Sequence, residues 1–185
     1  MTRAWKTTAT GLIYENKWAR LRHDQVVAPD GSNTTYTFIE KPDCVAIIAR
    51  NRDGGIYLIR EYRYPVQQTL WQLPAGGFEK GLTFQENAQK ELKEETGITA
   101  QKWEKLGHIF IHPGSESTCM HVFLAQELDE KNVGTHGQET NEAIEHIEKI
   151  SPQKLDQLIR DNAIVCGWTL AALNLFLHRF PPKKN

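Results

Sequence analysis

The apolar residues of this chain gather in short runs separated by turn signals, which predicts alternating strands and helices. Residues 44–49 are continuously apolar, as expected for a strand buried on both faces, and residues 56–62 return as a second strand after a glycine-containing turn. The other strands predicted for this part of the chain are residues 103–111, 120–126 and 143–150. These elements form the expected sheet core.

Three helices are predicted from capping signals and periodicity. Thr83 with Glu86 forms a capping box for a helix over residues 83–96, and Gly97 stands where a glycine ends a helix. Ser151-Pro152 begins a helix that extends to about Arg160. A strongly apolar helix follows over residues 169–180. Helices interleaved with strands favour an α/β class, with a mixed β-sheet sandwiched between helix layers.

The first part of the chain is different in pattern. Residues 12–27 and 34–41 predict two strands around the turn Pro29-Asp30-Gly31. We therefore expect an N-terminal β-hairpin extension over residues 1–41 and a main domain over residues 42–185. A lone hairpin is marginally stable in water, so this one is expected to pack on the main domain or on a partner subunit.

Composition and charge narrow the function classes. The chain has 185 residues, 39% of them hydrophobic, and a formal net charge of −1, values typical of a globular protein without general attraction to nucleic acid or anionic membranes. No signal peptide or transmembrane stretch is expected. The three cysteines show no pairwise spacing and predict free, buried thiols in a cytoplasmic protein.

Three glutamates mark the candidate chemistry. Glu91, Glu94 and Glu95 are spaced so that their carboxylates share one helix face, where like charges repel. A solvated surface has this pattern too. The glycine turn before the helix, with Gly76 and Gly77, can bring backbone oxygens beside the carboxylates, and a hard divalent cation would then offset the repulsion.

The stretch over residues 73–98 resembles the signature box of the Nudix hydrolases. That box has a glycine, a glutamate and then Arg-Glu-Leu-x-Glu-Glu-x-Gly with an apolar residue, at fixed spacing. The positions in register are Gly76, Glu91, Leu92, Glu94, Glu95, Gly97 and Ile98. Leu82 and Lys90 replace the family's first glutamate and its arginine, which resemble a structural ion pair; Lys90 is expected to pair with Glu86 or Glu94 instead.

Two further segments are similar to the ADP-ribose pyrophosphatase branch of that family. Arg63 matches a branch arginine whose planar fork suits phosphate oxygens, although it also fits a surface position. Glu61 stands where the branch has glutamine, and Gln72 where it has glutamate, which predicts one negative charge fewer at position 72. The resemblance makes the Ala75 carbonyl a metal ligand, and it places Gln72 and Gly114 among the substrate-binding residues.

The branch takes a general base from a loop before the last strand. Residues 136–144 form that loop here, and two glutamates compete for the role. Glu142 fits the branch pattern before Ile144 best, Glu139 is second, and either can also be a solvated loop carboxylate.

Taken as a resemblance, these residues imply a Mg²⁺-dependent nucleotide-sugar diphosphatase, with Mn²⁺ as the alternative ion. Glu91, Glu95 and the Ala75 carbonyl would bind the metal, with Glu94 assisting there and in catalysis. ADP-ribose is the expected substrate, and GDP-mannose and ADP-glucose are alternatives. A nucleotide-sensing module without catalysis is the alternative of another class. The branch also implies a homodimer formed through residues 1–41.

Overall fold

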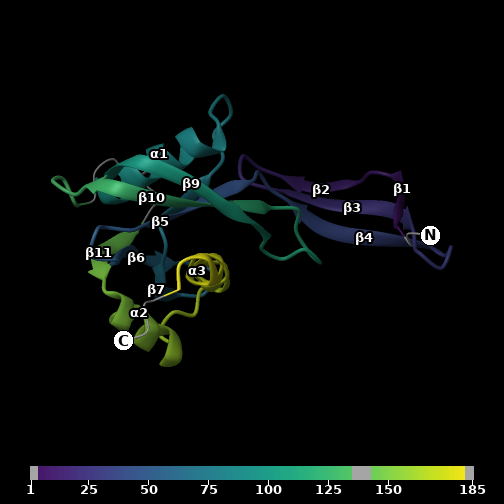
Figure 1. The fold of residues 1–185 in the computed structure, drawn as a ribbon. Coiled ribbons are helices and arrows are strands. Elements are labelled where there is room, and N and C mark those ends of the chain that lie inside the picture. The colour runs from purple at the N-terminus through teal and green to yellow at the C-terminus, as the bar shows by residue number, and fades with distance from the viewer. Residues whose placement is uncertain (1–3, 135–142, 182–185) are drawn as a thin grey trace. The chain divides into compact units, whose positions relative to one another are not determined.

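The computed structural model describes residues 4–134 and 143–181, which fall into two compact units. The first unit comprises residues 1–43 with 110–119, and the second comprises residues 44–109 with 120–185. Each unit has its own sheet structure (Figure 1). No helix in the described ranges is long and apolar enough to cross a membrane.

The N-terminal unit is a four-stranded antiparallel sheet around β3. Its strands are β1 (Lys6–Ala9), β2 (Leu12–Glu15), β3 (Arg20–Val27) and β4 (Asn33–Glu40). β1 and β2 both pair with β3, and β4 pairs with β3 throughout, from Arg20 opposite Glu40 to Val27 opposite Asn33. The sequence predicted only a two-strand hairpin here. β1 was not predicted, because its four residues are all exposed and lack the buried alternation by which a strand is recognised. The strand predicted over residues 12–27 is divided into β2 and β3.

The second unit contains two sheets and three helices. One sheet has the strand order β8-β5-β10-β9 and the other β11-β6-β7. The strands are β5 (Cys44–Ala49), β6 (Ile56–Arg63), β7 (Gln68–Gln72), β8 (Ala75–Gly77), β9 (Thr99–Phe110), β10 (Cys119–Asp129) and β11 (Ile144–Ile150), and the helices are α1 (Phe84–Thr96), α2 (Pro152–Arg160) and α3 (Gly167–Arg179). The expected mixed α/β fold is confirmed.

The two faces of β5 explain its continuously apolar sequence. Val45 and Ile47 pack with Ala88 and Leu92 of α1, whereas Ile48 packs in a second cluster with α2 and α3. β5 is thus buried between helix layers, and Figure 1 shows α1 and α3 on opposite sides of this sheet. β5 also pairs in parallel with β10 and antiparallel with β8, which fixes the glycine turn beside α1.

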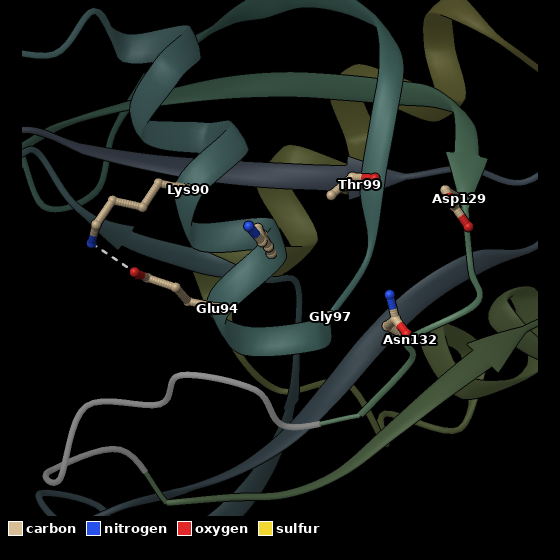
Figure 2. A pocket seen from close by; sticks show the side chains of 7 residues that line it. Lys90, Glu94, Gly97, Thr99, Asp129 and Asn132 are labelled. Atoms are coloured by element: carbon tan, nitrogen blue, oxygen red, sulfur yellow. Dashed lines mark hydrogen bonds and ion pairs between the residues drawn. The ribbon is translucent and has the colours of Figure 1, made fainter.

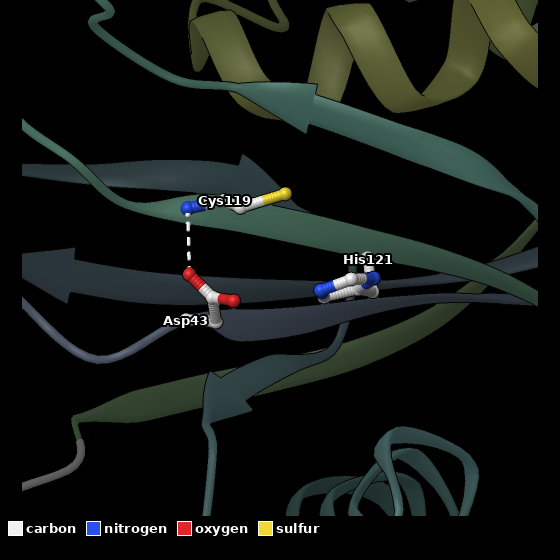
Figure 3. Close-up of side chains that lie close together, drawn as sticks. All are labelled: Asp43, Cys119 and His121. Carbon is white, nitrogen blue, oxygen red and sulfur yellow. Dashed lines mark hydrogen bonds between the residues drawn. The ribbon is translucent and has the colours of Figure 1, made fainter.

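The expectation of three buried cysteines is wrong for two of them. None of the three cysteines, all of which lie in the described ranges, forms a disulfide, but only Cys166 is buried; Cys44 and Cys119 are half-buried. Both lie at the first residue of their strands, β5 and β10, where the sheet begins and side chains are less enclosed. The Cys119 N–H donates a hydrogen bond of 3.0 Å to the Asp43 carboxylate (Figure 3).

Candidate active site

Helix α1 carries the acidic residues, and its ends are fixed by local chemistry as predicted. The Thr83 hydroxyl accepts from the Glu86 N–H and the Glu86 carboxylate accepts from the Thr83 N–H, so the capping box is complete. Gly97 adopts a left-handed φ of 73° and its N–H donates to the Lys93 carbonyl. These caps set the rotation at which the glutamates face the sheet.

Two of the three box glutamates are buried. Glu91 is 8% exposed and Glu95 is 2% exposed, whereas Glu94 is half-buried at the rim. Ionised carboxylates seldom occupy such positions unless charged or hydrogen-bonding groups compensate for lost hydration. The interpretation of Glu91 and Glu95 as a solvated surface is therefore excluded.

The glycine turn lies directly against these carboxylates. The Ala75 N–H donates a 2.9 Å hydrogen bond to Glu95 Oε2. At Gly76, an added Cβ would lie only 2.1 Å from the Glu91 carboxyl carbon, so glycine is required because the backbone and the carboxylate approach too closely for any side chain. Ala75, Gly76, Glu91 and Glu95 are thus brought together as expected.

Asn87 is a site residue that the sequence analysis missed. Its side chain is fully buried, donates to the Gly77 carbonyl at 3.0 Å and accepts from the Glu79 N–H at 2.9 Å. It ties the glycine turn to α1 at two points. The available signal was its position four residues before Glu91, which puts both side chains on the same helix face.

Lys90 replaces the missing family ion pair in an unexpected way. Its ammonium group lies 2.8 Å from Glu94 and 3.3 Å from Glu79, so the Glu94 pairing is confirmed. The alternative pairing with Glu86 is not seen, because that carboxylate is engaged in the capping box. Hydrogen bonding to Glu94, then the nearby charge of Glu91 and the hydrogen bond to Glu79, raise the pKa of Lys90 above its ordinary value.

A cavity of about 770 Å³ adjoins α1 on the side of Glu94. It is lined by Lys90, Lys93, Glu94, Gly97, Thr99, Asp129 and Asn132, and Figure 2 shows the Lys90–Glu94 ion pair at its edge. Glu91 and Glu95 face the glycine turn rather than this cavity. Of the three box glutamates, Glu94 is the one that lines this cavity.

Arg63 is contacted by Glu61 and Gln72, the two positions at which the chain departs from the ADP-ribose pyrophosphatase branch. Its Nη2 lies 2.7 Å from the Glu61 carboxylate, and its Nε donates to Gln72 Oε1 at 2.7 Å. Position 72 is uncharged, and Glu61 supplies a carboxylate to the same guanidinium. β6 and β7 are antiparallel neighbours, which brings positions 61 and 72 together.

The remaining predicted residues belong to the N-terminal unit or fall outside the described ranges. Gly114 belongs to the N-terminal unit, where its carbonyl accepts a 2.8 Å hydrogen bond from the Tyr36 hydroxyl. It lines a cavity of about 510 Å³ in that unit, together with Trp5, Thr7, Asp24, Val26, Tyr36, Phe38, Pro113, Ser115, Glu116 and Ser117. Glu139 and Glu142 lie outside the described residues.

The candidate metal ligands near the glycine turn at Ala75–Gly77 are all oxygen atoms. Glu91 and Glu95 offer carboxylate oxygens, Glu94 adds another at the rim, and the Ala75–Gly77 backbone runs beside them. Hard divalent cations such as Mg²⁺ and Mn²⁺ prefer such ligands over nitrogen or sulfur. The absence of a Cβ at Gly76 keeps backbone and carboxylate close enough to share an ion. The residues therefore fit a divalent metal.

This combination of fold and site defines a hydrolase of the Nudix class, and comparison with known proteins agrees. The family model described as NUDIX domain matches residues 40–164. The chain belongs to the Nudix family. Members of this family generally depend on divalent metals. A second model, described as nucleoside diphosphate sugar hydrolase N-terminal domain, matches residues 5–39.

Individual relatives are similar over different shares of the chain. An ADP-ribose pyrophosphatase of Bacillus subtilis (strain 168) is 36% identical over 123 residues, which are 66% of this chain and 66% of the relative. A methanol dehydrogenase activator of Bacillus methanolicus is 29% identical over 91% of this chain and 90% of the relative. An ADP-ribose pyrophosphatase of Mycobacterium tuberculosis is 35% identical over 68% of this chain and 58% of its own length. The chain thus spans somewhat under two thirds of the length of these two ADP-ribose pyrophosphatases.

A solved structure shows the same fold. The crystal structure of an ADP compounds hydrolase superposes with a TM-score of 0.79, covering 95% of this chain and 92% of that chain, at 21% sequence identity. At this level of identity the likeness supports the fold alone.

Proposed function

We propose that this protein hydrolyses the diphosphate bridge of a nucleotide sugar, with ADP-ribose as its substrate and AMP and ribose 5-phosphate as products. The observation that carries this proposal is the burial of Glu91 and Glu95 against a glycine turn that has no room for a side chain. The substrate class is supported by relatives named ADP-ribose pyrophosphatase and by the sugar-hydrolase model matched at residues 5–39.

The metal is proposed to be Mg²⁺, with Mn²⁺ as the alternative. Glu91, Glu95 and the Ala75 carbonyl would hold it, assisted by Glu94. When bound, such an ion neutralises charge on phosphoryl oxygens and so favours attack on phosphorus. The hydrogen bond from the Ala75 N–H fixes one Glu95 oxygen, which orients the carboxylate.

The protein's own side chains supply the other functions. Arg63 binds diphosphate oxygens through its guanidinium and stabilises the negative charge that grows there. Glu142, or Glu139, takes a proton from the attacking water. Oxygen from water bonds to one phosphorus while the bridging P–O bond breaks, and the two monophosphates leave. Glu91 and Glu95, which are buried, would attract a bound cation more strongly than exposed carboxylates, because the dielectric constant around them is lower.

The assembly is proposed to be a homodimer formed through the N-terminal unit. That unit exposes an unusual number of large apolar side chains: Trp5, Leu12, Ile13, Tyr14, Trp18 and Ile39. Such surface area is typical of a protein interface. The three described cysteines form no disulfide, which favours a reducing compartment, and we propose a cytoplasmic location.

The test is an assay of phosphate release by a coupled phosphatase, with ADP-ribose, GDP-mannose and ADP-glucose, with and without Mg²⁺. We expect turnover of ADP-ribose above the others and its loss when the metal is chelated. Glu95→Gln should lower kcat at least ~10-fold, because an amide is a poor ligand for a hard cation. Its oxygen still accepts the Ala75 N–H, so the fold should persist.

The matched control is Glu104→Gln, the same chemical change at a half-exposed residue of β9 that pairs with Arg179. It should retain wild-type kinetics, and circular dichroism should be the same for both variants. Binding of these nucleotide sugars without any turnover would contradict the proposal and favour the nucleotide-sensing alternative.

A further inference from the structure

The guanidinium of Arg63 is contacted along one edge by two side chains, a carboxylate and an amide. Glu61 Oε2 lies 2.7 Å from Nη2, and Gln72 Oε1 accepts from Nε at 2.7 Å. Nε and Nη2 form one edge of the planar guanidinium, so the hydrogen bond to Gln72 and the ion pair with Glu61 hold the group from the same side. Both partners are buried: Glu61 is 4% exposed and Gln72 is 2% exposed.

The amide of Gln72 is itself fixed in orientation. Its Nε2 donates a 3.1 Å hydrogen bond to the sulfur of Cys166, the residue that precedes the first turn of α3. A flip of the amide would place two donors against Arg63 and remove the donor to sulfur. Because buried polar groups are costly when unpaired, the observed orientation is strongly favoured.

Because Glu61 and Gln72 contact the Nε–Nη2 edge, the edge of the Arg63 guanidinium that carries Nη1 is available to bind another group. Across residues 4–134 and 143–181, Nη1 has no hydrogen-bond or ion-pair partner, and 39% of the Arg63 side chain remains exposed. Gln72 is three residues before Ala75, whose backbone N–H donates a hydrogen bond to the Glu95 carboxylate. This short segment, at most ~10 Å long, links the arginine to the acidic face of α1.

We propose that Glu61 and Gln72 are a positioning pair, which presents the free edge of Arg63 to the diphosphate and requires one carboxylate and one amide. The inference rests on the proposed function for the identity of the anion. Neither residue contacts substrate; both act through Arg63. Gln72, buried and bonded at both ends of its amide, thus contributes to substrate binding indirectly.

The requirement for one carboxylate and one amide follows from charge. Two carboxylates around one guanidinium leave a buried negative charge that repels a diphosphate. Two amides leave the guanidinium without its ion pair and its plane less firmly held. Exchange of the two side chains keeps one of each, and the Cys166 thiol can then donate to a carboxylate at position 72.

The experiment compares Glu61→Gln, Gln72→Glu and the double exchange. Steady-state kinetics with ADP-ribose give kcat and KM, and calorimetry with inorganic pyrophosphate and Mg²⁺ gives affinity for the diphosphate alone. Each single variant should lower kcat/KM and pyrophosphate affinity ~10-fold or more, the range expected from losing a charged hydrogen bond. The double exchange should recover both to within ~3-fold, a coupling that independent positions do not show.

Gln101→Glu, the same added charge at an exposed position of β9, is the matched control and should leave all values unchanged. Thermal unfolding identifies any variant that loses activity because it is misfolded. Such a variant would not recover pyrophosphate affinity in the double exchange. If the loss of kcat/KM and pyrophosphate affinity in the double exchange equals the product of the losses in the two single variants, Glu61 and Gln72 act independently. That result would overturn the proposed positioning pair. If wild-type protein binds pyrophosphate but turns over no nucleotide sugar, the proposed function fails, and the pyrophosphate affinities still decide whether the pair positions Arg63.

Discussion

The backbone at Gly76 lies so close to the Glu91 carboxyl group that no side chain fits between them. Gly77, its neighbour, has open space where a Cβ would be. The structural requirement for glycine therefore differs between the two positions. Gly76 is needed for close approach, whereas nothing around Gly77 excludes a small side chain.

This difference gives a matched pair of substitutions. Gly76→Ala should displace the Glu91 carboxylate and lower kcat/KM at least ~10-fold, with a stability cost of about 1–3 kcal/mol from overpacking. Gly77→Ala should change either quantity far less. Urea unfolding and ADP-ribose kinetics on both variants make the comparison. Equal activity of the two would show that Glu91 does not need its present position.

Single residues also show where sequence reasoning stopped. The box glutamates and Ala75 were predicted together because they belong to one stretch that resembles the Nudix box and its branch motif. Glu61 and Gln72 were considered separately, since only the pairing of β6 with β7 brings them to one guanidinium. Asn87 was missed because its importance comes from contacts with the turn, not from its type.

Among the elements, α1 was predicted most accurately, since its caps are local. The Thr83 and Glu86 side chains that begin it are three residues apart, and the Gly97 backbone N–H that ends it donates to the Lys93 carbonyl, four residues earlier. β7 and β8 were not predicted, because their short sequences, QTLWQ and AGG, become strands only through pairing with β6 and β5. Strand formation depends on neighbours that the local pattern does not contain.

The link between the glycine turn and α1 can be tested through Lys90. Glu79→Gln, Lys90→Met and the double variant form a cycle, and we expect a coupling of about 0.2–1 kcal/mol, because both side chains are partly exposed. Lys90→Met alone should cost more than Glu79→Gln, since it also removes the pair with Glu94. Urea unfolding at pH 7 measures both, with Lys93→Met as control.

The pH dependence of this link has a definite sign. The folded pKa of Lys90 is raised, so its contribution is complete below the unfolded value, about 10.4, and is lost as pH rises through the folded value. The difference in stability between wild type and Lys90→Met should therefore be constant at neutral pH and shrink only in strong alkali. A coupling of zero at pH 7 would show that Glu79 and Lys90 act independently.

On the scale of the whole molecule, the N-terminal unit exposes Leu12 and Tyr14 at 55% and 59% on one short strand, β2. If this surface forms the proposed dimer, light scattering at micromolar concentration should give twice the 21.2 kDa chain mass. Leu12→Lys with Tyr14→Lys should shift the mass to that of a monomer, because buried unpaired charges oppose association.

The control for that prediction adds the same two charges on β4, as Thr34→Lys with Thr35→Lys, at exposed polar positions. It should remain dimeric. A wild-type chain that scatters as a monomer would contradict the homodimer directly, whatever the variants do.

The parallel pairing of β5 with β10 has a consequence for how the chain is made. Cys44 lies opposite Met120, so β5 leaves the ribosome long before its partner, and α1 and β9 are synthesised between them. Until then the apolar segment Cys44–Ala49 has only β8, α1 and other earlier elements to cover it. Pairings this distant in sequence form slowly and leave hydrophobic strands open to aggregation. The central strand of the second unit therefore remains without its parallel partner for much of the synthesis of the chain, and it is exposed to aggregation during that time.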